Sequence, residues 1–221
     1  MKNKGRILLP LFIFIFCFVT SFSTQGQFDK SVWKGSAALL NDAASLPFAG
    51  KAGIVHLPIH PGGVVAVERN WTSGPKFQWS QTAKIGYINH RYLQHILQLY
   101  TELQANYRLQ KPWMVYAGLG LGYAHAFTNH HDKFEIQENG TYKKKANVGR
   151  AQAMFGLNLG SSLNVGQAFE RNVAVFMNYH MWFQMPFVNQ YVPLLPHSTL
   201  QIGLKFNLHS NDKNESGEEY F

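Results

Sequence analysis

Cysteine and long apolar runs are scarce in this chain of 221 residues. The one cysteine, Cys17, lies in an apolar segment near the N-terminus, so the rest of the chain has no disulfide and no thiolate chemistry. Beyond that segment, no unbroken apolar stretch approaches the roughly 20 residues that a membrane-spanning helix needs. These absences exclude a helical membrane protein and leave two classes: a soluble secreted protein, or a β-barrel whose apolar residues are diluted by alternation.

The N-terminus has the three parts of a secretory signal peptide. A basic start (MKNKGR) precedes an apolar run of about a dozen residues, and a small, polar segment (TSFSTQGQ) follows. We expect cleavage after Gly26, which places Thr24 and Gly26 at the small-residue positions of the cleavage site.

The clearest periodicity lies in residues 96–110, ILQLYTELQANYRLQ. Odd positions such as Leu97, Leu99 and Leu103 are mostly apolar, whereas even positions such as Gln98 and Glu102 are mostly polar. Successive side chains of a strand point to opposite faces, so this pattern predicts one long strand with an apolar face and a polar face. Soluble strands usually run about 5–6 residues, and this length favours a transmembrane strand.

The same alternation recurs along the chain and predicts an all-β protein, an eight-stranded antiparallel up-and-down transmembrane β-barrel preceded by a signal peptide. The predicted strands are residues 53–60, 64–71, 76–89, 96–110, 113–127, 150–165, 173–185 and 198–208. Pro61-Gly62-Gly63 is interpreted as the turn between the first two. The corresponding division is a signal peptide at 1–26, a periplasmic lead-in at 27–51, the barrel at 52–208 and a polar periplasmic tail at 209–221.

Loop lengths indicate how such a barrel would be oriented. The short connections 72–75, 111–112 and 166–170 fall at one end, and the long connections 129–147 and 187–197 fall at the other. Transmembrane barrels have short periplasmic turns and longer extracellular loops. We therefore expect an outer-membrane protein with both termini in the periplasm and the long loops outside the cell.

The polar face is predicted to line the lumen. An eight-stranded barrel has room only for packed side chains, and the strand at 113–127 supplies glycines opposite the bulky polar residues of 96–110. The predicted lumen network is Lys84, Gln98, Glu102, Gln104, Asn106 and Arg108. Because an isolated buried charge is costly, we expect Lys84 and Glu102 to form an ion pair across neighbouring strands.

The segment QIGLKFNL at 201–208 resembles the C-terminal insertion signal of outer-membrane β-barrels, with Leu208 in place of the usual final aromatic residue. With the signal peptide and the strand count, the chain is similar to small Gram-negative outer-membrane barrel proteins over nearly all of its mature length. The resemblance implies insertion by the barrel-assembly machinery and contact with outer-membrane lipid and lipopolysaccharide.

A basic patch marks the longest predicted loop. His130, His131, Lys133, Lys143, Lys144 and Lys145 could bind lipopolysaccharide phosphates or another acidic ligand, or could simply suit an anionic membrane surface. Adjacent histidines in a loop rarely build a tetrahedral metal site, so we expect no metal. No zinc-type spacing, phosphate-binding glycine loop or nucleic-acid motif appears, so neither a cofactor nor a nucleic-acid partner is expected.

One enzymatic alternative comes from a second resemblance. The run Tyr179-His180-Met181-Trp182, with Pro196-His197 after a long loop, is similar in layout to the lipid A deacylase family. The resemblance implies a serine nucleophile two residues after the histidine, and here that position is Trp182. A hydroxyl activated by a nearby base is indispensable to this mechanism.

Three hypotheses therefore remain. The first is an outer-membrane barrel of structural or binding role, with no open pore and no catalytic site. The others are a membrane-embedded lipid A deacylase-like hydrolase and a soluble secreted β-barrel that binds an apolar ligand. The sequence leaves the ligand and the oligomeric state open.

Overall fold

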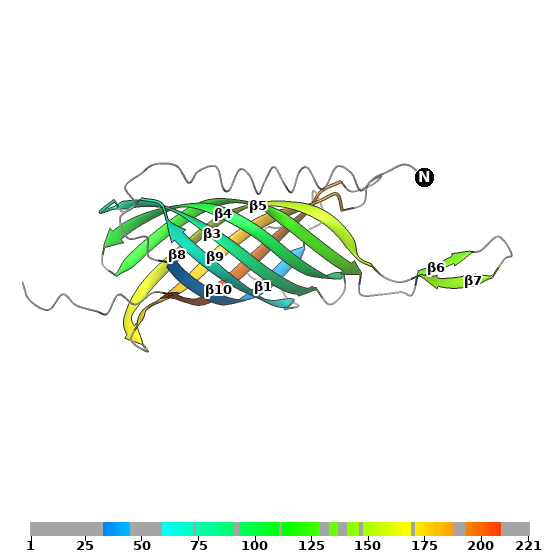
Figure 1. The fold of residues 1–221 in the computed structure, drawn as a ribbon, viewed down its shortest axis with the longest axis horizontal. Helices are drawn as coiled ribbons and strands as arrows, with labels where there is room; N and C mark the ends of the chain where they lie inside the picture. Colours follow the sequence, from blue (N-terminus) through cyan, green and yellow to red (C-terminus); the bar gives the residue numbers. More distant parts are fainter. Residues whose placement is uncertain are drawn as a thin grey trace, which may run out of the picture. The chain divides into compact units, whose positions relative to one another are not determined.

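Alternating apolar and polar residues form the strands of this protein, and eight of these strands close into an antiparallel barrel (Figure 1). The computed structural model describes residues 33–44, 59–72, 74–90, 93–110, 112–128, 133–136, 141–145, 148–168, 171–187 and 193–208. Within these ranges, no helix is long and apolar enough to cross a membrane. The predicted all-β, eight-stranded, up-and-down architecture is confirmed.

The barrel strands follow one another in chain order around the wall, with one hairpin inserted between β5 and β8. The strands are β1 (Trp33–Ala44), β2 (Pro61–Asn70), β3 (Phe77–His90), β4 (Gln94–Gln110), β5 (Trp113–Thr128), β6 (Lys133–Ile136), β7 (Tyr142–Lys145), β8 (Arg150–Ala168), β9 (Arg171–Met185) and β10 (Leu195–Asn207). Strands β6 and β7 pair with each other and with no other described strand, and β1 pairs with β10 to close the barrel.

The position of the first strand corrects the sequence analysis. Residues 27–51 are predicted to be a lead-in without a strand, but Trp33–Ala44 forms β1 and pairs with both β2 and β10. The strand predicted at 53–60 is wrong at Ile59 and His60, which are described and are not in a strand. Its other residues, 53–58, lie outside the described residues. The segments 1–26 and 209–221 also lie outside them.

Strand β1 was not recognised from alternation because both of its faces are apolar at mid-strand. Ala38 and Leu40 are buried on the lumen side, whereas Leu39 is exposed on the outer side. Because the middle of the inner face has no polar residue, no sustained alternation marks the strand in the sequence. The structure of the strand follows instead from its pairing with β2 and β10.

The predicted turn at Pro61-Gly62-Gly63 is also wrong, since these residues belong to β2. Gly62 is needed there for a close approach of neighbouring strands. A Cβ atom at this position would lie 2.3 Å from the Tyr87 carbonyl oxygen and 2.6 Å from Leu40 Cδ1. Glycine at this position therefore serves packing inside the wall.

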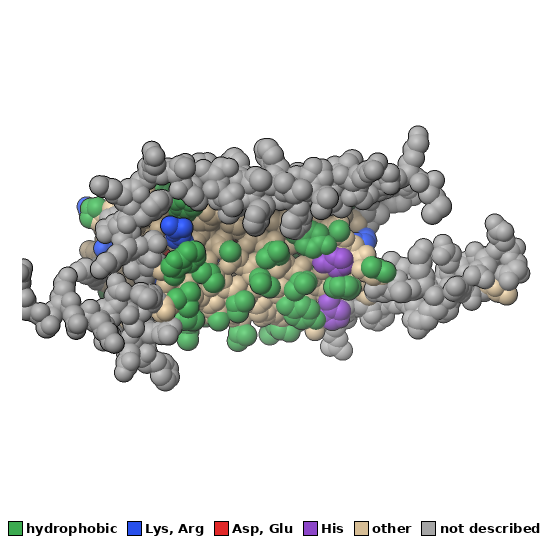
Figure 2. Space-filling model, viewed as in Figure 1, with side chains coloured by type: hydrophobic (Ala, Val, Ile, Leu, Met, Phe, Trp, Pro, Cys, Tyr) green, Lys and Arg blue, Asp and Glu red, His purple; other side chains and the backbone are tan. Residues whose placement is uncertain are grey.

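Strand β4 has the two faces that its sequence predicts. Leu97, Leu99 and Leu103 are 47–49% exposed on the outside of the barrel, whereas Gln98 and Glu102 are 2% and 1% exposed inside it. Among the described residues, buried polar and charged side chains outnumber buried apolar ones. Figure 2 shows apolar side chains spread over the visible part of the wall. The barrel is therefore apolar outside and polar inside.

Candidate functional site

The lumen holds most of the buried polar side chains, and glycines on β5 leave space for them. Gly120 lies opposite Glu102 and Gly122 lies opposite Tyr100 in the register of β4 with β5. A Cβ atom on Gly120 would be 3.0 Å from Glu102 Cγ, and one on Gly122 would be 2.3 Å from Tyr100 Cβ. The large side chains of β4 therefore lie over a strand that lacks side chains at these positions.

The central cluster is built on the carboxylate of Glu102. Lys84 Nζ lies 2.7 Å from Glu102 Oε2, so the predicted ion pair is present. Gln104 Nε2 donates to the same oxygen at 2.8 Å, and Asn158 Nδ2 also donates to it. His180 Nε2 lies 3.8 Å from Glu102 Oε1. These contacts join β3 and β4 to β8 and β9 across the lumen.

Aromatic stacking encloses this cluster. The rings of Tyr100 and His180 are stacked at 5.5 Å between centroids, with 10° between their planes. Lys84 Nζ lies 5.6 Å from the centroid of the Tyr100 ring, within reach of a cation–π interaction. His180 is 1% exposed inside the barrel.

A loop-end cluster lies nearer the end of the barrel where β1 finishes and β10 begins. Asp42 Oδ2 is 2.9 Å from His197 Nδ1, and Thr199 Oγ1 donates to Asp42 Oδ1 at 2.9 Å. Trp182 stacks on His197 at 3.9 Å between centroids and donates from Nε1 to Thr199 Oγ1 at 3.1 Å. His197 Nε2 lies 3.0 Å from Gln184 Oε1.

This arrangement has the carboxylate and imidazole of a hydrolytic site but lacks its geometry. A general base needs a ring nitrogen within hydrogen-bond reach of the proton that it removes. Both ring nitrogens of His197 already face oxygen atoms, from Asp42 and Gln184, and the side chain is 3% exposed. The loop-end cluster therefore links β1, β9 and β10 and offers no accessible base.

A terminal-end cluster lies in the lumen at the opposite end of the barrel, where β1 begins and β10 finishes. Glu68 meets two cations: Lys205 Nζ lies 2.5 Å from Oε2 and Lys34 Nζ lies 3.6 Å from Oε1. Lys205 Nζ also lies 5.2 Å from the centroid of the Tyr116 ring. The cluster joins β10, β1 and β2 where the barrel closes.

The remaining predicted lumen residues are also found on the inner face of β4. Asn106 Nδ2 donates to Ser80 Oγ at 2.8 Å, and the Gln98 side chain covers Gly86. Arg108 is half-buried and lines a pocket of about 360 Å³ with Met114 and Asn164. The structure thus brings the central cluster together and places Arg108 apart from it.

The structure describes only part of the predicted basic loop. His130 and His131 lie outside the described residues. Lys133 pairs with Lys145 in the β6–β7 hairpin, while Lys143 and Lys144 are in β7. Ligand binding by this loop stays a prediction. In the described part of the chain, no three His, Cys, Asp or Glu residues are grouped in a way that could hold a metal ion.

Sequence reasoning missed Asp42, Glu68 and His197 as lumen residues. Asp42 was hidden because β1 was not recognised, and Glu68 and His197 pair with residues far away in the sequence. For Gln184 and Asn178 the alternation of polar and apolar residues was a usable signal, because both lie on the polar face of β9 together with His180.

No protein-family model and no curated protein sequence matches the chain. Among solved structures, Neisserial surface protein A is 14% identical, with 80% of this chain and 96% of that chain covered and a TM-score of 0.46. The attachment invasion locus protein Ail of Yersinia pestis, in complex with the heparin analogue sucrose octasulfate, is 11% identical, with 81% and 100% covered and a TM-score of 0.43. The outer membrane enzyme PagL is 12% identical, with 77% and 97% covered and a TM-score of 0.43. Function must therefore be inferred from this chain's own lumen and wall.

Proposed function

We propose that this chain is an outer-membrane β-barrel of structural or binding role whose lumen is closed by its own side chains. The observation that carries the proposal is the inverted polarity of the barrel. Leucines such as Leu119 and Leu121, 64% and 67% exposed, face outward, and charged residues such as Lys84 and Glu102 are buried inside. A soluble barrel that binds an apolar ligand would need the opposite arrangement, because apolar side chains would line its interior.

Aromatic residues at the strand ends support a membrane location. Four aromatic residues are exposed on the outer wall near the end of the barrel where β1 begins and β10 finishes: Trp33, Trp79, Tyr107 and Trp113. Phe127 is exposed near the opposite ends. Transmembrane barrels carry such aromatic girdles at both membrane interfaces.

The connections support an orientation with both termini in the periplasm. At the end where β1 begins and β10 finishes, consecutive strands are joined by the short connections 71–76, 111–112 and 169–170. On the other side lie the long connections 129–149, which contains the β6–β7 hairpin, and 186–194. Long extracellular loops and short periplasmic turns are the usual arrangement in this class. The basic residues of 130–145 would then face lipopolysaccharide phosphates.

Hydrogen bonds across the lumen argue against an open pore. Gln94 on β4 donates to Gln184 Oε1 on β9 at 2.8 Å, and Glu102 on β4 faces His180 on β9. These strands are separated by two others in the barrel wall. Side chains that meet from opposite walls leave no continuous water column of the kind found in porins.

Two observations argue against hydrolysis at His180. The side chain is buried in the lumen, away from the lipid face, and stacks on Tyr100. The position of the family's serine is held by Trp182, whose indole nitrogen donates to Thr199. A lipid ester would find neither an accessible base nor an activated hydroxyl there.

Cell fractionation and electrophoresis test the location. The protein should be recovered with outer membranes, and the unheated, folded form should migrate differently from the boiled form. Recovery in the soluble periplasm would overturn the proposal. In planar bilayers the purified barrel should give no stable conductance steps, whereas steps of porin size would overturn the closed lumen. Lipid A acylation should be the same in cells with and without the protein.

A further inference from the structure

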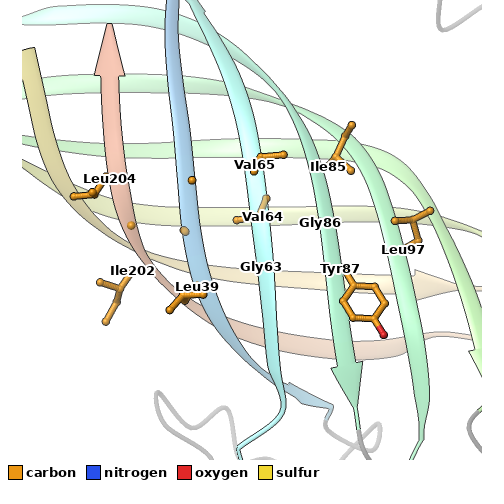
Figure 3. Close-up of a pocket in the computed structure, with 13 residues that line it drawn as sticks. Leu39, Gly63, Val64, Val65, Ile85, Gly86, Tyr87, Leu97, Ile202 and Leu204 are labelled. Atoms are coloured by element: carbon orange, nitrogen blue, oxygen red, sulfur yellow. The ribbon is translucent and has the colours of Figure 1, made fainter. Parts of the chain in front are cut away.

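The outer wall of the barrel has an apolar groove of about 520 Å³ on β1, β2 and β3 and their neighbours (Figure 3). The residues that line it are Ala37, Ala38, Leu39, Gly63, Val64, Val65, Ile85, Gly86, Tyr87, Leu97, Ile202, Gly203 and Leu204. Its volume falls in the range of small-molecule sites, about 300–1,000 Å³. The groove is therefore large enough to hold part of a ligand in place.

Gly63 gives the groove its floor. In the strand register, Gly63 lies between Leu39 on β1 and Tyr87 on β3. Figure 3 shows Leu39 and Ile202 on one side of β2 and Tyr87 on the other. Among the described residues, a Cβ atom on Gly63 would meet only the Ala38 carbonyl oxygen within 4 Å, at 3.7 Å. The space above this glycine is thus open, unlike that above Gly62.

A polar pair lies beside the apolar groove on the side of the long loops. The Tyr87 hydroxyl and His95 Nδ1 are 2.9 Å apart, and the two rings are stacked with 11° between their planes. His95 pairs with Asn89, two residues beyond Tyr87 toward the end of β3. The structure gives His95 Nε2 no partner within the described part of the chain. One end of the groove can therefore hydrogen-bond a polar group, while its lining is apolar.

We propose that this groove binds one acyl chain of lipopolysaccharide, with the Tyr87–His95 pair contacting the polar head of the same molecule. The inference rests on the proposed outer-membrane location and on the long loops facing outward. An apolar groove with a polar pair at one end matches an amphiphile. Tyr87 lies three residues from the end of β3, about 10 Å along the strand, which places the pair near the outer surface of the bilayer. The lipid of that leaflet is lipopolysaccharide.

Filling the groove provides the test. Gly63→Leu places a side chain into the open space at a strand position that imposes no left-handed backbone. Ala117→Leu is the matched control, because Ala117 faces outward on β5 between Ala105 and Leu159, far around the wall. Tyr87→Phe removes the hydroxyl and keeps the ring.

Each variant would be refolded in detergent, incubated with purified lipopolysaccharide or with phosphatidylethanolamine, and measured by native mass spectrometry. The unmodified barrel and the Ala117→Leu variant should retain one lipopolysaccharide molecule. Gly63→Leu should lower its retention at least tenfold, and Tyr87→Phe should lower it several-fold. All four proteins should show the same heat-modifiable mobility.

Equal lipopolysaccharide retention by Gly63→Leu and the unmodified barrel would overturn the inference. Retention of phosphatidylethanolamine in preference to lipopolysaccharide would also overturn it. A dimer of the unmodified barrel that the Gly63→Leu change dissociates would overturn it too, because the groove would then be covered by a second copy of the chain. These outcomes would leave the proposed function intact as long as the protein stays heat-modifiable and fractionates with outer membranes. Loss of those two properties in the unmodified protein would refute the proposed function itself.

Discussion

Replacing Lys84 with methionine should strongly destabilise the barrel, because it leaves the carboxylate of Glu102 buried without its closest cation. Over the 2.7 Å between Lys84 Nζ and Glu102 Oε2, the attraction is about 6 kcal/mol at an effective dielectric constant of about 20. Part of this loss is offset, because the ammonium group no longer has to be buried. Hydrogen bonds from Gln104 and Asn158 to Glu102 remain. We expect Lys84→Met to lower the free energy of unfolding by about 3–5 kcal/mol.

The double variant Lys84→Met/Glu102→Gln separates charge from packing. Glutamine keeps the shape of Glu102 and removes the uncompensated charge, so the double variant should be within about 1–2 kcal/mol of the unmodified barrel. The two single changes should therefore be strongly non-additive. Additive losses, with the double variant worse than either single one, would refute the claim that these residues stabilise the lumen as a pair.

Urea unfolding of the barrel in lipid vesicles, followed by tryptophan fluorescence and heat-modifiable mobility, would measure these differences. A loss of 3 kcal/mol is a change of about a hundredfold in the folding equilibrium. Lys34→Met is the matched control. Lys34 is 20% exposed and lies 3.6 Å from Glu68, which keeps Lys205 at 2.5 Å. Lys34→Met should lower the free energy of unfolding by about 1 kcal/mol or less.

Three further predictions follow from the faces of the wall. Leu103→Arg should lower the free energy of unfolding in vesicles by about 2–4 kcal/mol, because the outer face meets lipid. A change of less than about 0.5 kcal/mol in the same urea titration would place that face in water. Gly122→Val should lower the folded fraction on gels, because its side chain would overlap Tyr100; wild-type folding would mean that β4 and β5 can separate there. Trp182→Phe should lower the free energy of unfolding by about 1 kcal/mol, because the hydrogen bond to Thr199 is lost. Trp182→Ala should lower it by about 3–5 kcal/mol, because it leaves a cavity.

The faces of β4 could be predicted from the sequence because alternation is a local property. Every second residue of a strand points the same way, so the order Leu97, Gln98, Leu99 fixes which side chains share a face. The same reasoning placed Lys84 and Glu102 on one face, and their ion pair is present. Seven of the eight barrel strands overlap a predicted range for this reason.

The sequence by itself therefore determined the strands and the polar face wherever polarity alternates. Only the tertiary structure decided that Trp33–Ala44 closes the barrel, since Ala38 and Leu40 make the middle of its inner face as apolar as its outer face. It also decided that Asp42 meets His197, 155 residues away. Such pairs depend on register and on closure between the first and last strands, which are non-local properties that no local pattern of residues encodes.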